Sequence, residues 1–283
     1  MDFNTYTKSD IFHKPHYLVV GNPVMHSKSP LMHNLALKHY GMDAEYAALQ
    51  LDMADLTSFI SLMNRDEFRG CNITIPYKNA FNEIVDQVDP LVDATGSMNT
   101  VVKEDGLLVG YTTDIAGFSM PLNEYRSQLK DEGAIVFGSG GASKAVIHAL
   151  FQMGMTGICV VSRDPQSLDF KNERIIKADY NTWQHAGENA ILLVNCTPLG
   201  MQAMDQKSPV DEQDNYLLMG KICYDLVYNP LNTPFLRQAE NSGAIGIGGL
   251  DMLIHQGSES FRLWTGKTFP IDLIKKELLK ELS

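Results

Sequence analysis

Apolar residues in this chain occur in two kinds of pattern, short continuous runs and longer stretches at helical spacing. The short runs are typical of buried strands. They lie at residues 17–20, 45–51, 134–137, 158–161, 174–178, 190–194 and 222–226. The longer stretches place apolar residues on one face at a period of about 3.6 residues, which predicts amphipathic helices. They include residues 54–63, 144–150 and 251–264. Strands that alternate with helices indicate an α/β protein with parallel sheets.

Local turn and cap signals add the remaining elements. Glu104-Asp105-Gly106 separates two apolar runs and predicts a β-hairpin of strands 97–103 and 107–111. Ser29-Pro30 predicts a helix start, with the Ser29 hydroxyl as the cap and the proline at the first helical position. Further expected elements are helices at 90–94, 233–240 and 271–279 and a last strand within 243–249.

A glycine-dense turn follows the run at 134–137 and leads directly into a helix. It reads Gly138-Ser139-Gly140-Gly141-Ala142. In a dinucleotide-binding unit Gly138 allows the tight turn and Gly140 lets backbone amides approach a pyrophosphate, to which the helix N-terminus offers partial positive charge. The alternative is an ordinary tight loop of an α/β protein, because a single glycine fingerprint is weak evidence.

Polar side chains gather where the predicted strands end. Ser27 and Ser29 follow the first strand, and Lys78 follows a short strand near residues 70–75. In open α/β sheets the carboxyl ends of the strands border the crevice in which ligands bind. The alternative is that the serines are only turn and cap residues and that the lysine is a solvated surface charge.

Three further polar residues lie on or after predicted strands, and one of them has two interpretations. Asn72 and Thr74 lie two apart on the short strand, so their side chains point the same way. Asp114 lies at the exit of the predicted hairpin, where a helix is expected to begin. A carboxylate at such a position is often a simple N-cap. The local pattern leaves both interpretations open.

Composition narrows the classes of function. The chain has 283 residues, of which 44% are hydrophobic, and its 23 basic and 34 acidic side chains give a net charge of −11. This balance argues against a nucleic-acid partner, which requires clustered lysine and arginine. No apolar run reaches membrane-spanning length or has the pattern of a signal peptide. The 4 cysteines are far apart, which predicts reduced thiols, no metal site and a cytoplasmic protein.

Taken together, these stretches resemble the shikimate dehydrogenase family over nearly the whole chain. The matching positions lie within residues 21–30, 72–78, 98–100, 113–117, 138–143, 195–201, 225–234 and 249–266. The resemblance implies an N-terminal α/β substrate domain at 1–117, completed by C-terminal helices at 251–283. It also implies a Rossmann-like, doubly wound nucleotide-binding domain at 118–250.

The resemblance also implies roles for individual residues. In the family, the matches of Lys78 and Asp114 form the catalytic pair. The implied substrate-binding residues are Ser27, Ser29, Asn72, Thr74, Asn99, Tyr228 and Gln256. The implied cofactor-binding residues are Gly138, Ser139, Gly140, Gly141, Ala142, Ser162, Arg163, Thr197, Leu226 and Gly249. The cofactor is NADP, and no metal is implied.

The implied activity is the reversible NADPH-dependent reduction of 3-dehydroshikimate to shikimate, on the route to chorismate and the aromatic amino acids. The implied protein is a monomer or a homodimer that binds small molecules, with neither nucleic acid nor membrane as a partner. Two departures from the family pattern bear on this. Thr112-Thr113-Asp114 stands where many members have Asn-Thr-Asp. Ser162-Arg163-Asp164 stands where NADP-preferring members have Asn-Arg-Thr, and the next basic residue is Lys171.

The second departure leaves the choice of cofactor open, because an acidic residue such as Asp164 can accept from a free ribose hydroxyl and repel a phosphate. Two alternatives therefore stand beside the main hypothesis. One is a quinate/shikimate dehydrogenase that uses NAD or NADP. The other is a non-catalytic dinucleotide-binding paralogue, which would be expected to have lost Lys78 or Asp114.

Overall fold

The computed structural model describes residues 1–78, 80–170, 172–201 and 207–282, and the chain divides into two compact units. The first unit is made mainly of Met1–Thr113 and Gln256–Glu281. The second is made mainly of Asp114–His255. Each unit is built on its own six-stranded sheet.

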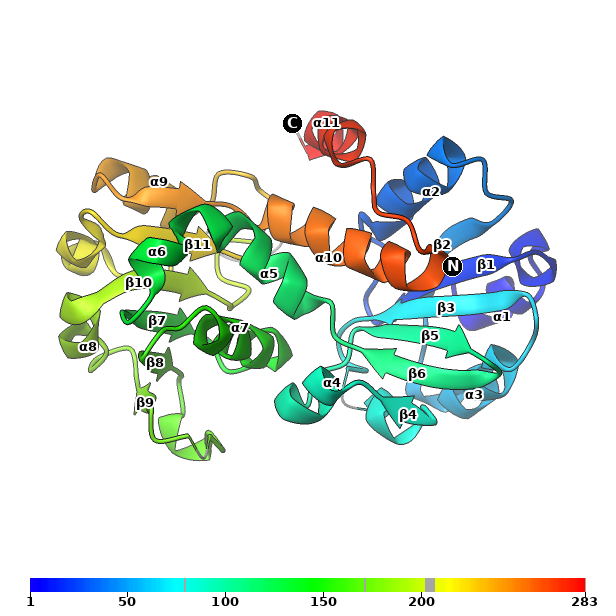
Figure 1. Ribbon diagram of the computed structural model, residues 1–283, viewed down its shortest axis with the longest axis horizontal. Coiled ribbons are helices and arrows are strands. Elements are labelled where there is room, and N and C mark those ends of the chain that lie inside the picture. Colours follow the sequence, from blue (N-terminus) through cyan, green and yellow to red (C-terminus); the bar gives the residue numbers. More distant parts are fainter. Residues whose placement is uncertain (79, 171, 202–206, 283) are drawn as a thin grey trace. The chain divides into compact units, whose positions relative to one another are not determined.

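The sheet of the first unit is mixed (Figure 1). Its strands, in spatial order, are β2 (Glu45–Gln50), β1 (His16–Gly21), β3 (Phe68–Ile73), β5 (Thr100–Glu104), β6 (Leu107–Tyr111) and β4 (Gln87–Val88). The pairs that β1 makes with β2 and with β3 are parallel, whereas β5 is antiparallel to both β3 and β6. All residues of β1 are buried, as expected for a central strand covered on both faces.

Short helices complete the N-terminal part of this unit. The α-helices are α1 (Phe3–Thr7), α2 (Ser29–His39), α3 (Leu56–Met63) and α4 (Pro90–Thr95), and the 3₁₀ turns are η1 (Asp10–His13), η2 (Met53–Asp55) and η3 (Ala80–Glu83). Phe59 and Met63 of α3 are fully buried and pack in one core cluster with Leu18 and Ile73 of the sheet. These two residues are the buried ones of α3, in a segment whose helical period predicted one apolar face.

The C-terminal helices return to the first unit, and one of their contacts depends on a glycine of its sheet. They are α10 (Gly249–Thr265), of which residues 256–265 belong to this unit, and α11 (Ile271–Leu282). The indole Nε1 of Trp264 donates to the carbonyl of Val101 at 2.9 Å. A Cβ at Gly70 would lie 2.4 Å from that Nε1. Only glycine at position 70 therefore leaves room for Trp264 to reach β5.

The sheet of the second unit is entirely parallel. Its strands, in spatial order, are β12 (Ile245–Ile247), β11 (Ile222–Asp225), β10 (Ala190–Asn195), β7 (Gly133–Phe137), β8 (Gly157–Val161) and β9 (Ile175–Ala178). Read from β9, this is the strand order 3-2-1-4-5-6 of a doubly wound dinucleotide-binding fold. The order reverses between β7 and β10.

Helices precede, connect and follow these strands along the chain, as Figure 1 shows. They are α5 (Asp114–Leu122), α6 (Arg126–Leu129), α7 (Gly141–Gln152), α8 (Gln184–Asn189), α9 (Pro234–Asn241) and the start of α10, with 3₁₀ turns η4 (Asn123–Tyr125), η5 (Pro165–Ser167) and η6 (Glu212–Leu218). The ring of Phe118 in α5 stacks on Tyr224 of β11 with centroids 4.9 Å apart. The predicted fold class is confirmed, with an α/β first unit, a doubly wound second unit and C-terminal helices that return to the first.

Several predicted strands were too long, and in two of them the difference exceeds one residue. The expected strand 97–103 begins only at Thr100, because Thr100 pairs with Tyr111, the last residue of β6. The expected strand within 243–249 is reduced to Ile245–Ile247, which pairs with three residues of β11. Strand ends depend on where a partner ends, and the hydrophobic pattern of one segment does not contain that information.

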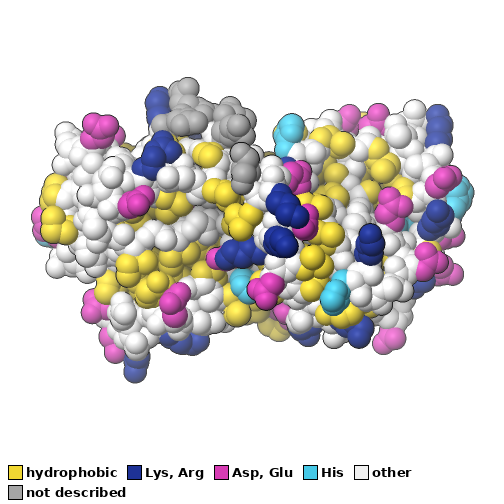
Figure 2. All heavy atoms as spheres, turned by 90° about the horizontal axis from the view of Figure 1, so that it is seen from above, with side chains coloured by type: hydrophobic (Ala, Val, Ile, Leu, Met, Phe, Trp, Pro, Cys, Tyr) yellow, Lys and Arg dark blue, Asp and Glu magenta, His cyan; other side chains and the backbone are white. Residues whose placement is uncertain are grey.

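The surface is chemically mixed. On the face drawn in Figure 2, acidic and basic side chains are interspersed among apolar ones. Some large apolar side chains are exposed, among them Ile75 and Met219, and single exposed residues of this kind are common in soluble domains. Among the described residues no helix combines the length and the apolar character needed to cross a membrane.

A buried histidine makes the stability of the first unit depend on pH. His33 of α2 stacks on the Tyr46 ring, with centroids 4.2 Å apart, and meets the edge of Phe269. Burial lowers the pKa of His33 to about 3. In the unfolded chain a histidine binds a proton below about pH 6.5. Between these values the unfolded state binds one more proton than the folded state, so the free energy of unfolding falls as the pH falls.

We predict that His33→Leu removes this contribution. The free energy of unfolding of the wild type should lose, through His33, about 1.4 kcal/mol for each pH unit below about 6.5. The variant lacks the imidazole, so its stability relative to the wild type should rise as the pH is lowered from 7 to 5. Urea unfolding of both proteins across this range measures the difference. Parallel stability curves would contradict the prediction.

Candidate active site

The loops after β1 and β3 of the first unit are held against each other. The amide of Thr74 donates to Val20 O and that of Asn22 to Ile75 O, each at 2.9 Å. A Cβ at Gly21 would lie 2.4 Å from Thr74 Cγ2. Glycine at position 21 therefore lets the two strand ends approach. As a result, the loop with the two predicted serines and the loop with Lys78 begin at adjacent points.

The serine loop differs from the prediction in one respect. Ser29 is the first residue of α2 and not its N-cap, and Lys28 occupies the cap position. The Ser27 hydroxyl accepts a hydrogen bond from the Ser29 amide at 3.2 Å. The prediction that the Ser29 hydroxyl caps the helix is therefore wrong, because the preceding serine already satisfies the backbone there. The Lys28 ammonium forms an ion pair with Glu281 of α11 at 2.7 Å.

The amide side chain of Asn72 is buried and held on both sides. Its Oδ1 accepts from the Tyr46 hydroxyl at 2.7 Å. Its Nδ2 lies within hydrogen-bond distance of three acceptors, Asn99 O, Thr100 Oγ1 and Ser260 Oγ. Because Tyr46 donates to one end and the acceptors surround the other, the orientation of this amide is determined by its neighbours.

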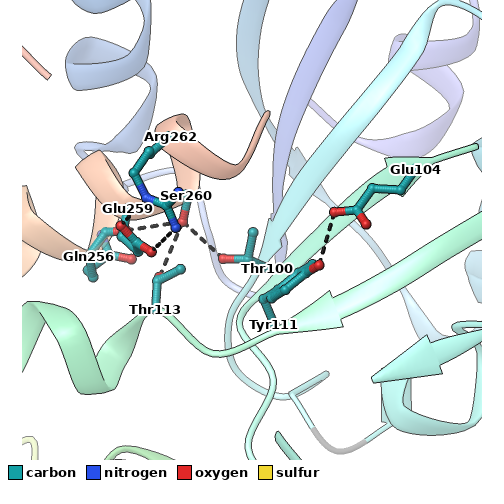
Figure 3. Close-up of polar contacts among 8 residues, drawn as sticks. All are labelled: Thr100, Glu104, Tyr111, Thr113, Gln256, Glu259, Ser260 and Arg262. Atoms are coloured by element: carbon teal, nitrogen blue, oxygen red, sulfur yellow. Dashed lines mark hydrogen bonds and ion pairs between the residues drawn. The ribbon is translucent and has the colours of Figure 1, made fainter. Parts of the chain in front are cut away.

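Asn99 anchors the chain directly before Asp114. Its Oδ1 accepts from the Thr113 amide at 2.8 Å, and its Nδ2 donates to Thr113 Oγ1 at 2.9 Å. Thr113 is also joined to Ser260 of α10, four residues after Gln256 (Figure 3). The structure thus brings the predicted residues Asn72 and Asn99 together in one buried network that reaches Gln256.

Lys78 and Asp114 each follow a residue that is held in place by a hydrogen bond, but the two residues lie in different units. Lys78 is half-buried and follows Tyr77, which is buried and donates its hydroxyl proton to the carbonyl of Leu51. Asp114 is the buried first residue of α5, as the sequence predicted, and is preceded by the anchored Thr113. Lys78 belongs to the first unit and Asp114 to the second.

In the second unit the glycine loop lies at the point where the strand order reverses. Gly138 has a φ of +102°, and a Cβ there would lie 3.0 Å from Thr197 Cγ2. Glycine is therefore needed both for the backbone conformation and for the approach of the loop after β10. Open α/β sheets bind their ligands at this reversal point.

The second glycine of the loop, Gly140, leaves open space at the N-terminus of α7. Gly140 is the N-cap of α7, and a Cβ placed on it would meet no atom within 4 Å. The amides of the first turn of α7 have no acceptor within the helix, as at any helix N-terminus. Ser139 approaches Ser162 at the tip of β8, with the hydroxyls 3.5 Å apart. These features fit the pyrophosphate and ribose of a dinucleotide.

A second buried network holds the loops after β10 and β11. Asn195 Nδ2 donates to Asp225 Oδ1 at 2.9 Å, and Asn195 Oδ1 accepts from the Thr197 hydroxyl at 2.7 Å. Asp225 also accepts from the Thr233 hydroxyl and from the Val227 amide. Burial raises the pKa of Asp225 to about 6, although these hydrogen bonds favour the carboxylate. The Leu226 amide donates to Asn195 O at 3.0 Å, so the predicted residues Thr197 and Leu226 are both bonded to Asn195.

The side chains of Arg163 and Asp164 differ in whether the protein engages them. Asp164 Oδ1 accepts from the Ser167 amide at 3.3 Å, so the carboxylate caps η5. Arg163 is exposed. Of the other nearby cations, Arg174 lies over the Phe151 ring and Lys177 donates to the carbonyl of Leu168. Lys171, the next basic residue after Arg163 in the sequence, lies outside the described residues.

The last two predicted positions of this unit, Tyr228 and Gly249, also lie beside the loop after β11. Tyr228 is half-buried, and burial raises the pKa of its hydroxyl. A Cβ at Gly249 would lie 2.2 Å from Leu226 O. Glycine at this point lets α10 begin against the loop. Among the residues that the structure describes, no group of three or more His, Cys, Asp or Glu could hold a metal ion.

Sequence reasoning assigned no role to the residues that support the site. These are the buried polar side chains Tyr46, Thr100, Thr113, Asn195, Asp225, Thr233 and Ser260. Asn195 and Asp225 had a signal, because each is a polar residue at the end of an apolar strand. Tyr46 and Ser260 had none, since a tyrosine in a strand and a serine in a helix are ordinary.

Comparison with known proteins covers both units. The family model of the shikimate dehydrogenase substrate binding domain matches residues 19–101, and that of the shikimate 5′-dehydrogenase C-terminal domain matches 249–279. The shikimate dehydrogenase (NADP(+)) of Nostoc sp. is 36% identical over 276 residues, which cover 93% of this chain and 96% of the relative.

Solved structures are similar over the same extent. Shikimate 5-dehydrogenase from Thermus thermophilus, in complex with NADP(H) and shikimate, is 34% identical with a TM-score of 0.81, covering 94% of this chain and 98% of that one. Quinate dehydrogenase from Corynebacterium glutamicum, in complex with NAD, is 27% identical with a TM-score of 0.85, covering 94% and 99%.

We predict that Gly249→Ala lowers the free energy of unfolding by about 1–3 kcal/mol, because the added methyl group requires the backbone of Leu226 to move. Gly157→Ala is the matched control, since its Cβ would meet nothing within 4 Å. The control should change stability by less than about 0.5 kcal/mol. Urea unfolding measures both values. Equal stabilities of the two variants would show that the contact with Leu226 does not restrict position 249.

Proposed function

This chain belongs to the shikimate dehydrogenase family, and on that basis we propose that it is an NADP-dependent oxidoreductase that interconverts 3-dehydroshikimate and shikimate. The observation that carries the proposal is the match to a shikimate dehydrogenase (NADP(+)) over 93% of this chain. The match extends over both units. The buried networks around Asn72 and Asn195 support the proposal, because they prepare polar groups at the carboxyl ends of both sheets.

We propose that polar groups of the first unit, together with Tyr228, bind the substrate. Ser27 and Ser29 would hold the carboxylate of the substrate, since short hydroxyls at a helix start donate to an anion. Thr74, Asn99 and Gln256 would contact its hydroxyls. Asn72 would contribute to the binding site as part of the buried network, because its Nδ2 is already surrounded by protein acceptors.

Lys78 and Asp114 are the proposed catalytic pair. Negative charge develops on the substrate oxygen as the ketone becomes an alcohol. The ammonium of Lys78 would stabilise this charge and donate a proton to the oxygen. Asp114 would accept hydrogen bonds from the ammonium or from a neighbouring substrate hydroxyl. Thr113 would keep Asp114 in place, since both its amide and its hydroxyl are bonded to Asn99.

The second unit would hold the cofactor. When bound, NADP supplies the nicotinamide that accepts or donates the hydride. The amides at Gly140, Gly141 and Ala142 would bind the pyrophosphate, and Thr197, Leu226 and Gly249 would border the nicotinamide side of the crevice. Arg163 would pair with the 2′-phosphate, because its planar guanidinium suits that group. The capping role of Asp164 supports NADP, since its carboxylate is engaged by the Ser167 amide.

The direct test measures absorbance of the reduced nicotinamide with shikimate or quinate, each with NADP or NAD. We expect the highest kcat/KM with shikimate and NADP, and Arg163→Ala should lower it with NADP but not with NAD. Because Ser27 and Ser29 would be engaged by the carboxylate, the extra hydroxyl of quinate would lack room and a partner, a cost of roughly 1–3 kcal/mol. Equal rates with quinate would assign the chain to the quinate/shikimate branch. Absence of turnover with every pair would favour a dinucleotide-binding paralogue.

We also predict that Lys78→Met lowers kcat about 10²-fold or more, because general acid assistance of this kind contributes roughly 10²–10⁴ to the rate. The matched control is Lys38→Met, at an exposed position of α2 in the same unit. This control should keep the kcat of the wild type. Steady-state rates and a thermal unfolding curve for each variant separate loss of chemistry from loss of fold. A Lys78→Met enzyme with the kcat of the control would refute the role of Lys78.

A further inference from the structure

The hydroxyl of Ser260 joins several distant parts of the first unit. Its Oγ lies 2.9 Å from Asn72 Nδ2, 2.9 Å from Thr100 Oγ1, 3.2 Å from Thr113 Oγ1 and 3.1 Å from Gln256 O. Figure 3 shows the contacts of Ser260 with Thr100, Thr113 and Gln256. Ser260 is fully buried. One side chain of α10 therefore contacts β3, β5 and the segment after β6.

The single proton and two lone pairs of the Ser260 hydroxyl limit which of these contacts can be hydrogen bonds at the same time. A serine hydroxyl donates one hydrogen bond and accepts two. Donation to Gln256 O leaves the two acceptor positions for Asn72 Nδ2 and for one of the two threonine hydroxyls. The oxygen is then saturated. An alanine would remove an acceptor of the Asn72 amide and a partner of the threonines at the same time.

Each partner of Ser260 lies next to a proposed binding residue or is one. Asn72 is held by Ser260 at one end and by Tyr46 at the other. Thr113 precedes Asp114 and is bonded to Asn99. Gln256 lies one helical turn before Ser260, on the same helix. These residues are separated by up to 188 positions in the sequence, so no local turn can hold them in register.

We infer that Ser260 is a positioning residue for substrate binding. Its hydroxyl orients the amide of Asn72 and restrains Thr113, and through them it sets the positions of Asn99 and of the backbone at Asp114. This inference rests on the proposed function, because it assigns Ser260 to the substrate side of the site. The Ser260 hydroxyl is saturated by the protein atoms around it, so Ser260 is not a catalytic residue.

The test compares Ser260→Ala with Ser258→Ala. Ser258 lies in the same helix, is also buried, and accepts from the Phe269 amide at 3.0 Å. Both variants lose one buried hydroxyl, so a similar small decrease in Tm is expected for both. A lost network hydrogen bond is worth about 0.5–1.5 kcal/mol, roughly a 2- to 13-fold change. We therefore expect Ser260→Ala to raise KM for shikimate about 3- to 10-fold, with KM for NADP unchanged.

Ser258→Ala should leave both KM values unchanged. An unchanged KM for shikimate in Ser260→Ala, with an active wild type, would overturn this inference and leave the proposed function intact. So would an equal rise in both variants, because that would indicate general loosening of α10. A wild type that neither oxidises nor binds shikimate in calorimetry would overturn the proposed function and this inference with it.

Thr100→Val provides an independent check on the network. The Thr100 hydroxyl contacts both Ser260 and Asn72, so the two hydroxyls share a partner. Mutations that act through one network are not additive. The double variant should raise KM for shikimate by less than the product of the two single effects. A rise equal to that product would mean that the hydroxyls act separately and would overturn the claim of one network.

Discussion

Both units depend on one constraint, which is that a buried asparagine near the end of a strand must find hydrogen-bond partners within the protein. Asn72 is the last residue but one of β3, and Asn195 ends β10. An unpaired buried amide costs roughly 1–3 kcal/mol, so each must find partners within the protein. Asn72 finds them in Tyr46 and Ser260, and Asn195 finds them in Asp225 and Thr197. The loops at the carboxyl ends of the sheets are arranged by this requirement.

This arrangement explains why a site can be built from separate segments. Backbone loops are usually the more mobile parts of a fold, whereas catalysis needs groups held in fixed geometry. Here the loops are attached to strand ends by buried side chains and are packed without spare room at Gly21, Gly138 and Gly249. A ligand group would therefore meet polar atoms whose positions are already determined, which reduces the entropy lost on binding.

The choice of cofactor shows how a structural contact changes the meaning of a residue. In the sequence, Asp164 beside Arg163 left the choice between NAD and NADP open. In the structure the carboxylate of Asp164 caps η5 through the Ser167 amide, so it is engaged within its own loop. Arg163 remains exposed at the end of β8.

The sequence by itself determined the fold class, most of the elements, and the positions where polar residues follow strands, because periodicity and turn chemistry are local properties. It predicted β6 at 107–111 as Leu107–Tyr111 is found, and it placed the start of α5 at Asp114. It did not predict β4 or α1, which are too short to show a period. Only the tertiary structure decided that Ser27 and not Ser29 satisfies the start of α2, and that Ser260 meets Asn72 across 188 positions. Hydrogen-bond partners so far apart are selected by packing, and the pattern of a single segment contains no record of them.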